Sequence, residues 1–327
     1  MRAYLVRRFL LMLLLLVLGS MVSFLVITLP PFDYVSDYVA RLQASGADVS
    51  PEQILALRRY YGVDDPKYLQ YLKWVFRLLQ GDPGRSFGWN RPIGQLIMER
   101  LPMTLVVGFG ALIVTYAIAI PIGIYSAVKQ YSVGDYAVSF VGFIGLSVPN
   151  FLLALIVMIA AHNFFGLSIG GLFSPLYDNA PWSTAKLLDL LAHLPIPLLV
   201  IGLASTASVI RTMRAMLLDE LRKPYVQTAR AKGVKEWELI LRYPVRVALL
   251  PIVASLAFAL PTIFSGTVIV GIVLNLPTMG PLLYNALVSV DLFLAATTLL
   301  ITIAMTVVGT FLSDLLLAVL DPRISYA

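Results

Sequence analysis

The sequence contains no cysteine and few charged side chains. Without cysteine the chain has no disulfide, no thiol nucleophile and no cysteine-ligated metal. Only 13% of its 327 residues are Asp, Glu, Lys or Arg, whereas 59% are hydrophobic. This balance is typical of a polytopic membrane protein, so we expect an all-α chain that crosses a bilayer several times.

Catalytic constellations are scarce as well. The two histidines, His162 and His193, form no H-E-x-x-H pair, and no G-x-x-x-x-G-K-[ST] motif is present to bind a nucleotide phosphate. Gly145-Leu146-Ser147 resembles a serine nucleophile turn, which makes an intramembrane hydrolase one alternative. Such a triplet inside an apolar run more often forms a close helix contact. We therefore expect a chain that is not an enzyme and holds no metal or cofactor.

Carboxylates are also rare inside the apolar runs. A proton- or sodium-driven carrier uses intramembrane carboxylates, but Asp314 is the only acid well inside such a run. Asp135 and Asp291 stand where runs begin, and we expect them to cap helices. A secondary carrier is thus a second alternative, which the sequence disfavours.

Long uncharged runs predict six transmembrane helices, because one span needs about 20 apolar residues. The 44-residue run at 247–290 contains Asn275, Pro277, Gly280 and Pro281, so we expect a span, a turn and a short segment there. The run at 136–177 predicts one long span with a glycine-rich exit. The uncharged runs are 9–32, 101–128, 136–177, 190–210, 247–290 and 292–313.

Lys and Arg in the short loops predict the orientation. They gather in the segments that would face the cytoplasm if the N-terminus does, and 166–193 and 275–290 hold almost none. Residues 1–29 are predicted as a cytoplasmic N-terminus and a retained first span, since a signal peptide has a shorter core. Residues 30–100 and 166–193 are predicted outside, and both termini inside. The net charge of +6 reflects this bias and gives no support to nucleic-acid binding.

The extracytoplasmic insertion at 30–100 is expected to form helices of its own. Ser50-Pro51-Glu52-Gln53 is typical of a capping box, and Gly62 would end that helix. A second helix would start after Asp65-Pro66, with an apolar face of Tyr68, Leu72, Val75, Phe76 and Leu79 opposite Lys67, Gln70, Lys73 and Arg77. The pair either packs over the membrane core or forms a platform for an external partner.

The loop at 218–246 is the most charged part of the second half of the chain. Residues 219–246 carry seven Lys/Arg and four Asp/Glu, whereas 190–210 and 247–290 carry none. Charge is costly in a bilayer, at roughly 2.5–3.5 kcal/mol per residue, so this loop lies in water. Pro224, Gly233 and Glu236 predict two short helices, with glycine as a left-handed cap between them. A structured, charged loop on a chain without an energy source suggests that a separate subunit docks there and supplies energy.

These residues resemble a known family, the permease subunits of binding-protein-dependent ABC importers, and in particular the first permease of the dipeptide/oligopeptide branch. The family's E-A-A-x-x-x-G motif stands here as Gln227-Thr228-Ala229-Arg230-Ala231-Lys232-Gly233. Other matching segments follow in the family's order: Arg7-Arg8, Gly81-Asp82-Pro83-Gly84-Arg85-Ser86, Arg100-Leu101-Pro102-Met103-Thr104-Leu105, Ser147-Val148-Pro149-Asn150-Phe151, Ala248-Leu249-Leu250-Pro251 and Leu320-Asp321-Pro322-Arg323.

The resemblance implies a type I ABC importer permease fold, with the insertion at 30–100 between the first and second spans and a five-helix core at 101–327. It implies as partners a second permease, two cytoplasmic ATPase subunits that bind ATP and Mg, and an external solute-binding protein. The residues expected to couple this chain to the ATPases are Gln227, Thr228, Ala229, Arg230, Ala231, Lys232, Gly233 and Glu236. The sparse neutral polar groups expected along the translocation path are Ser147, Asn150, Ser265 and Asn275.

Several positions depart from the family pattern. The motif glutamate is Gln227, which is common in the peptide branch. The remaining departures lie in the fifth span and the turn that follows it: Tyr243, Val247, Gly271, Pro277-Thr278-Met279-Gly280 and Val290 replace a His, an Asn, a Glu, a P-G-x-G turn and an Arg. Peptides are the expected solute, and oligosaccharides, which some members of the branch import, are the alternative.

Overall fold

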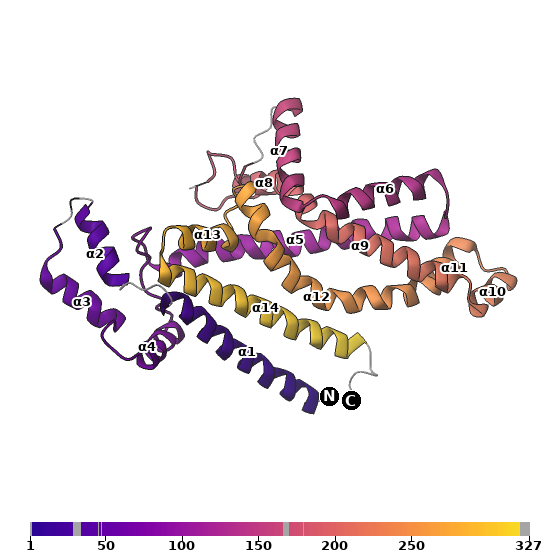
Figure 1. Cartoon of the computed structure of the whole chain (residues 1–327). Coiled ribbons are helices and arrows are strands. Elements are labelled where there is room, and N and C mark those ends of the chain that lie inside the picture. Colours follow the sequence, from indigo (N-terminus) through magenta and orange to yellow (C-terminus); the bar gives the residue numbers. More distant parts are fainter. Residues whose placement is uncertain are drawn as a thin grey trace. The chain divides into compact units, whose positions relative to one another are not determined.

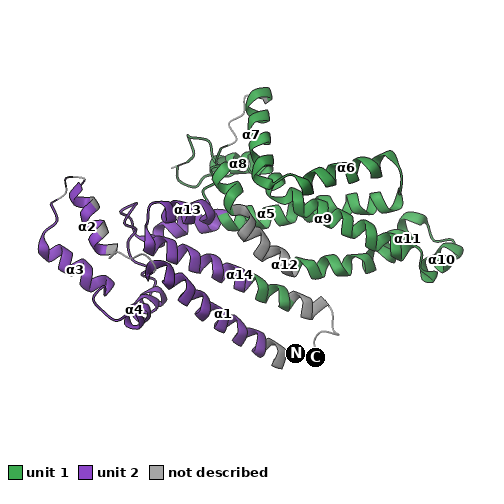
Figure 2. Cartoon of the chain, in the orientation of Figure 1, with its two compact units in different colours: residues 1–5, 104–277, 309–327 green, residues 6–103, 278–308 purple. Residues whose placement is uncertain are grey.

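The computed structural model describes residues 2–28, 34–44, 46, 48–165, 170–178 and 180–320 (Figure 1). Within these ranges the side chains at 2–5, 34, 37, 41, 165, 257–267 and 316–320 are not described. The described part of the chain is helical and contains no strand, only an isolated bridge between Arg85 and Pro92. It divides into two compact units, of residues 1–5, 104–277 and 309–327 and of residues 6–103 and 278–308 (Figure 2).

Five segments are helical, apolar and long enough to cross a membrane: Val6–Thr28, Ile93–Val128, Thr184–Leu221, Glu236–Leu256 and Leu292–Leu315. They correspond to α1 (Arg2–Thr28), α5 (Ile93–Val128), α8 (Thr184–His193) with α9 (Pro195–Leu221), α11 (Glu236–Arg242) with α12 (Pro244–Val273), and α14 (Leu292–Leu320). The bent pair α6 (Val133–Ser147) and α7 (Asn150–Phe165) gives a sixth span when the two helices are taken as one. The prediction of an all-α chain with six spans is thereby confirmed.

The sixth span is sharply bent, which the sequence did not predict. The run at 136–177 was expected to form one long span, but α6 and α7 meet at an angle of 110°. Val148 is extended, with φ −91° and ψ 126°, because the proline that follows it disfavours helical backbone and lacks an N–H. The break therefore follows from Pro149.

The run at 247–290 folds as predicted, into a span, a turn and a short segment. The span is α12, and the short segment is α13 (Met279–Val288). Asn275 lies in the turn with φ +49°, in the left-handed region that asparagine tolerates better than most residues.

Unit 2 contains α1 from Val6 on, α2 (Tyr34–Ala44), α3 (Pro51–Tyr61), α4 (Lys67–Leu79), the first turns of α5, α13 and most of α14. Its largest fully buried side chains include Trp74, Ile93, Leu96, Met279 and Leu294. The predicted capping box is confirmed, since Ser50 Oγ accepts from the Gln53 N–H at 3.3 Å and Gln53 Oε1 from the Ser50 N–H at 3.2 Å. The helix ends at Gly62.

Helix α4 has the predicted apolar face, but a different side of the helix is buried. Gln70, expected on the solvent side, is buried, and its amide donates to the carbonyl oxygens of Val63 and Asp65 at 3.0 and 2.7 Å. Trp74 is buried on the same side, whereas most of the predicted apolar face is exposed. Hydrogen bonds from the Gln70 amide to the loop before α4, which periodicity does not reveal, accompany the burial of this side.

Asp291 caps α14, as predicted. Its Oδ1 accepts from the Leu294 N–H at 3.3 Å. Its Oδ2 also accepts from the Ser86 hydroxyl at 2.5 Å and from the Gly88 N–H at 2.9 Å. The fully buried carboxylate thus joins the segment before α5 to the start of α14 within unit 2.

Unit 1 contains the rest of α5, α6 to α12 and the end of α14. Its α5 and α9 approach closely, because a Cβ at Gly123 would lie 2.7 Å from the Met213 Cβ and 3.1 Å from the Ile210 carbonyl oxygen. Small residues permit such contacts between membrane helices. Helix α9 leads directly into the charged loop at 218–246.

Candidate functional site

The loop between α9 and α12 forms two short helices, as predicted. They are α10 (Pro224–Ala231) and α11, and we call residues 222–243 the α10–α11 hairpin. Lys223 is the N-cap of α10 and Pro224 occupies its first turn, where a missing N–H costs nothing. Figure 1 shows the hairpin at one end of unit 1, beyond the ends of α9 and α12.

The turn between the two helices depends on Gly233. Its φ is +79°, in the left-handed region that favours glycine. The Gly233 N–H donates to the Arg230 carbonyl at 3.0 Å, and the Val234 N–H donates to the Ala229 carbonyl at 3.4 Å. A Cβ at Gly233 would meet no atom within 4 Å. Glycine is therefore required by the backbone conformation and not by lack of space.

An ion pair connects the two helices across this turn. Arg230 Nε lies 3.0 Å from Glu236 Oε2, and Arg230 Nη2 lies 2.5 Å from Glu236 Oε1. This carboxylate raises the pKa of the Arg230 guanidinium above its usual range. Both side chains are about half exposed, so the pair links α10 to α11 but adds little to stability.

Apolar packing attaches the hairpin to the long helices. Val226 of α10 and Leu239 and Ile240 of α11 are buried against α9 and α12. Tyr225 adds a polar contact, because its hydroxyl donates to Glu220 at 2.5 Å, and burial and this carboxylate raise the pKa of Tyr225 to about 12. The other buried members of this cluster are Ala127, Met213, Leu217, Val245, Ala248 and Ile252. The hairpin and the adjoining ends of α9 and α12 therefore share one apolar core.

The sequence-predicted coupling residues lie mostly on the free surface of the hairpin. Ala229 is partly buried beside the apolar cluster. Trp237, which the sequence analysis did not single out, is 66% exposed between Glu236 and Glu238. Its position in a charged loop could have indicated a binding role from the sequence, because tryptophan is frequent at binding hot spots. The exposed predicted residues are Gln227, Thr228, Arg230, Ala231, Lys232, Gly233 and Glu236.

A buried ion pair lies close to the hairpin, and it corrects the prediction for Asp135. We expected Asp135 to cap α6, but the cap is Ser132, whose hydroxyl accepts from the Asp135 N–H at 3.2 Å. The Asp135 carboxylate instead accepts two hydrogen bonds of 2.8 Å from Arg214 of α9, one from the Tyr131 N–H at 2.9 Å, and one from the Ser126 hydroxyl. It therefore joins α5, α6 and α9.

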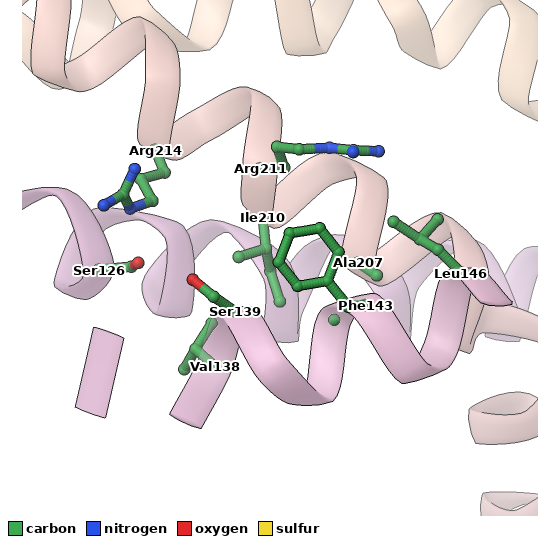
Figure 3. Close-up of a pocket in the computed structure, with 10 residues that line it drawn as sticks. Ser126, Val138, Ser139, Phe143, Leu146, Ala207, Ile210, Arg211 and Arg214 are labelled. Carbon is green, nitrogen blue, oxygen red and sulfur yellow. The ribbon is translucent and has the colours of Figure 1, made fainter. Parts of the chain in front are cut away.

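A cavity of about 150 Å³ opens beside this ion pair, between α5, α6 and α9. Figure 3 shows Arg214 and Ser126 at one end and Leu146 at the other, with the Phe143 ring between them. A neighbouring cavity of about 290 Å³ shares Val138, Gly142, Ala207 and Ile210 with it. The linings are mainly apolar, and Arg211 and Arg214 line the smaller cavity.

The predicted translocation residues are only partly brought together. Ser147 ends α6 and Asn150 begins α7, so both lie at the 110° bend. Asn275 is exposed in the turn after α12, where the Leu274 carbonyl accepts from the Gly171 N–H at 2.8 Å. Ser265 lies in α12 at a position outside the described side chains.

The Gly145-Leu146-Ser147 triplet packs through its glycine, whereas Ser147 is exposed. A Cβ at Gly145 would approach the Leu203 side chain of α9 to 3.2 Å, so the glycine permits a close helix contact. His193 Nδ1 donates to the Asp189 carbonyl at 2.8 Å, and His162 is exposed on α7. This arrangement supports packing over a serine–histidine pair.

Comparisons with known proteins match the whole length of the chain. The family described as "Binding-protein-dependent transport system inner membrane component" matches residues 119–326, and the corresponding N-terminal family matches residues 1–108. The oligopeptide transport system permease protein AppB of Bacillus subtilis is 33% identical over all of both chains. The peptidoglycan transport system permease protein YejB of Agrobacterium fabrum is 32% identical over 100% of this chain and 99% of its own.

The dipeptide transport system permease protein DppB of Escherichia coli K12 is 29% identical over 87% of this chain and 89% of its own. These matches confirm the resemblance drawn from the hairpin motif and the segments that accompany it. The chain belongs to the family of inner membrane components of binding-protein-dependent transport systems, the permeases of ABC importers.

Proposed function

We propose that this chain is the permease subunit of an ATP-driven importer of peptides and forms half of a translocation pathway together with a second permease. The observation that carries the proposal is the α10–α11 hairpin. It bears the family's motif on an exposed surface and is packed onto α9 and α12 through a buried apolar cluster. When a docked protein moves, such an element can transmit the movement to the membrane helices.

The energy would come from two ATPase subunits that dock on the hairpin and bind ATP and Mg themselves. Their closure would shift the permease pair between two arrangements, each open to one side of the membrane. The Arg230–Glu236 pair and the turn at Gly233 would keep the hairpin stiff while it is moved. In this role the chain itself performs no catalysis.

Peptides are favoured over oligosaccharides by the names of two of the three relatives, which are permeases of an oligopeptide and a dipeptide transport system. The chain would contribute little to the choice among peptides. Ser147, Asn150, Ser265 and Asn275 are neutral groups that offer no charge to bind a zwitterion. An external solute-binding protein would then set specificity.

The proposed orientation places both termini and the 218–246 loop in the cytoplasm, and the insertion at 30–100 outside. It rests on the distribution of Lys and Arg in the short loops. In this orientation the hairpin faces the compartment that contains ATP, and the insertion faces the binding protein.

Uptake into proteoliposomes tests the proposal. Vesicles containing this chain, its second permease and the ATPases are loaded with ATP and given binding protein and a labelled oligopeptide outside. Peptide should accumulate only when ATP and binding protein are both present. Exchange of the binding protein for one with another ligand should change which solute is taken up. Accumulation driven by an ion gradient without ATP would instead indicate a secondary carrier. Uptake of an oligosaccharide and not of peptides would contradict the choice of solute.

A further inference from the structure

Helix α4 carries an apolar face that unit 2 leaves uncovered. Tyr68, Leu72, Phe76 and Leu79 are 69%, 56%, 62% and 82% exposed. Their spacing of three to four residues places them on one side of the helix, and we call them the α4 stripe. Exposed apolar groups of this size on one face indicate contact with a membrane or with another protein.

The charged side chains of α4 point away from the stripe. Lys73 pairs with Asp65 at 2.5 Å. Arg77 donates to the Tyr60 carbonyl at 2.9 Å and lies 4.6 Å from the centre of the Tyr60 ring. These contacts are made with α3 and the loop after it, whereas the stripe itself contains no charge. A surface evolved for a soluble partner usually combines apolar with polar groups.

Contacts with α1 give the depth of α4 in the bilayer. The Tyr71 hydroxyl lies 2.7 Å from the Ser20 hydroxyl. The Phe24 ring centroid lies 5.5 Å from that of Tyr71 and 5.8 Å from that of Trp74. Phe24 and Ser20 precede the end of α1 at Thr28 by four and eight residues, which is about 6 and 12 Å along a helix.

The apolar part of α1 is only slightly longer than the hydrocarbon core of a bilayer is thick. Its span Val6–Thr28 has 23 residues and is about 34 Å long, close to the roughly 30 Å of a hydrocarbon core. Ser20 and Phe24 therefore lie at membrane depth, and so do the α4 side chains that contact them. In Figure 1, α1 is seen from the side whereas α4 is foreshortened, so the two helices cross rather than run together.

We propose that α4 is an interfacial helix whose stripe inserts among the phospholipid acyl chains of the leaflet in which α1 ends. Interfacial helices bury their apolar face about 5–10 Å into the boundary between headgroups and acyl chains, which agrees with contacts 6–12 Å from the end of α1. The polar contacts of Lys73 and Arg77 then hold α3 and the loop after it at the membrane surface. The inference is independent of the proposed coupling role, because it uses only residues of unit 2.

Spin labels on single cysteines test the inference, because the chain has no native cysteine. Leu72→Cys and Phe76→Cys are compared with Leu55→Cys on α3, where the native leucine is 54% exposed and outside the stripe. The whole transporter is reconstituted in lipid nanodiscs, and collisions of the label with oxygen, which partitions into lipid, and with a water-soluble nickel chelate are measured. Tyr68→Cys replaces either stripe variant that fails to assemble.

The proposal expects the oxygen-to-nickel ratio of the stripe labels to exceed that of the Leu55→Cys label several-fold, with or without binding protein. Nickel accessibility equal to that of Leu55→Cys would place the stripe in water and overturn the proposal. Labels shielded from both reagents, or shielded only after binding protein is added, would assign the stripe to a protein interface and also overturn it.

Discussion

Arg214 on α9 holds Asp135 on α6 through two hydrogen bonds of 2.8 Å each, from Nε and Nη2 to the two carboxylate oxygens. The Asp135 side chain is 3% exposed and that of Arg214 is 27% exposed. The Ser126 hydroxyl and the Tyr131 N–H are the other donors to this carboxylate. A buried, two-pronged ion pair therefore fixes α6 against α9 one turn away from Leu217, which packs beneath the hairpin.

Breaking this pair should destabilise the permease. Asp135→Asn leaves the Arg214 charge without its partner, which costs about 3 kcal/mol, the lower end of the range for broken buried pairs because Arg214 is partly exposed. Thermal unfolding of the purified chain in detergent measures the loss. Glu99→Gln, which breaks the exposed Arg91–Glu99 pair, is the control and should leave the unfolding temperature unchanged.

A double-mutant cycle separates the pair from its surroundings. Asp135→Asn combined with Arg214→Met removes both charges, and it should be less destabilising than the sum of the two single changes. Strict additivity of the three variants would show that the two side chains do not stabilise each other.

Substitutions at Gly233 should uncouple ATP hydrolysis from transport. The left-handed backbone costs a β-branched residue about 1 kcal/mol or more, so Gly233→Val should distort the turn and lower the peptide transported per ATP roughly five-fold. Gly233→Asn should retain more activity, because asparagine tolerates this conformation. Uptake and ATP hydrolysis are measured on the same proteoliposomes.

The matched control is Gly81, which has φ +81° and, like Gly233, no atom within 4 Å of a built Cβ. Gly81→Val imposes the same backbone strain in the segment before α5 and should leave the ratio of transport to hydrolysis unchanged. Equal losses at the two glycines would trace the effect to general destabilisation and remove the coupling role of the hairpin.

Trp237 should contribute to the binding of the ATPase. Truncation of an exposed aromatic hot spot costs about 1–2 kcal/mol, so Trp237→Ala should weaken the affinity of the purified ATPase for the permease about ten-fold. Trp182 is 62% exposed and distant in sequence from the hairpin, which makes Trp182→Ala the control. If both variants bound the ATPase as the parent does, Trp237 would lie outside the docking surface.

Asp291→Asn should loosen the segment that precedes α5. The amide keeps one acceptor oxygen but places an NH₂ group among the donors Ser86, Gly88 and Leu294, at a cost of about 1–3 kcal/mol. Limited proteolysis should then cut 81–92 faster than in the parent chain. Asp64→Asn, at a carboxylate that is 70% exposed, should not change the rate.

Patterns within one segment were enough to predict much of the fold. Charge-free runs predicted the spans, Ser50 and Gln53 predicted a capping box, and Gly233 predicted a left-handed turn. These features depend on neighbours in the sequence, whose chemistry is visible there. The position of the hairpin in the sequence could be predicted for the same reason, since Pro224, Gly233 and Glu236 are local indications of its two helices.

Features that depend on distant residues were missed. The Asp135 carboxylate is held by Arg214, 79 residues away, and no local pattern joins them. The apolar face of α4 is exposed, because contacts of Trp74 with Phe24 of α1 bury another side of the helix. Pro149 is a local indication of the bend at Val148, but the length of the apolar run favoured the prediction of one continuous span.

Cross-linking from the hairpin to the ATPase tests the central claim most directly. Lys232→Cys creates a single exposed thiol on the hairpin of a cysteine-free chain, and Leu55→Cys creates one on α3. A short thiol-to-amine reagent, added to the assembled transporter, should join Lys232→Cys to an ATPase subunit and leave Leu55→Cys unjoined. An impermeant thiol reagent added outside intact cells should label only Leu55→Cys. Failure of Lys232→Cys to cross-link in an assembled transporter, or its labelling from outside, would contradict the account.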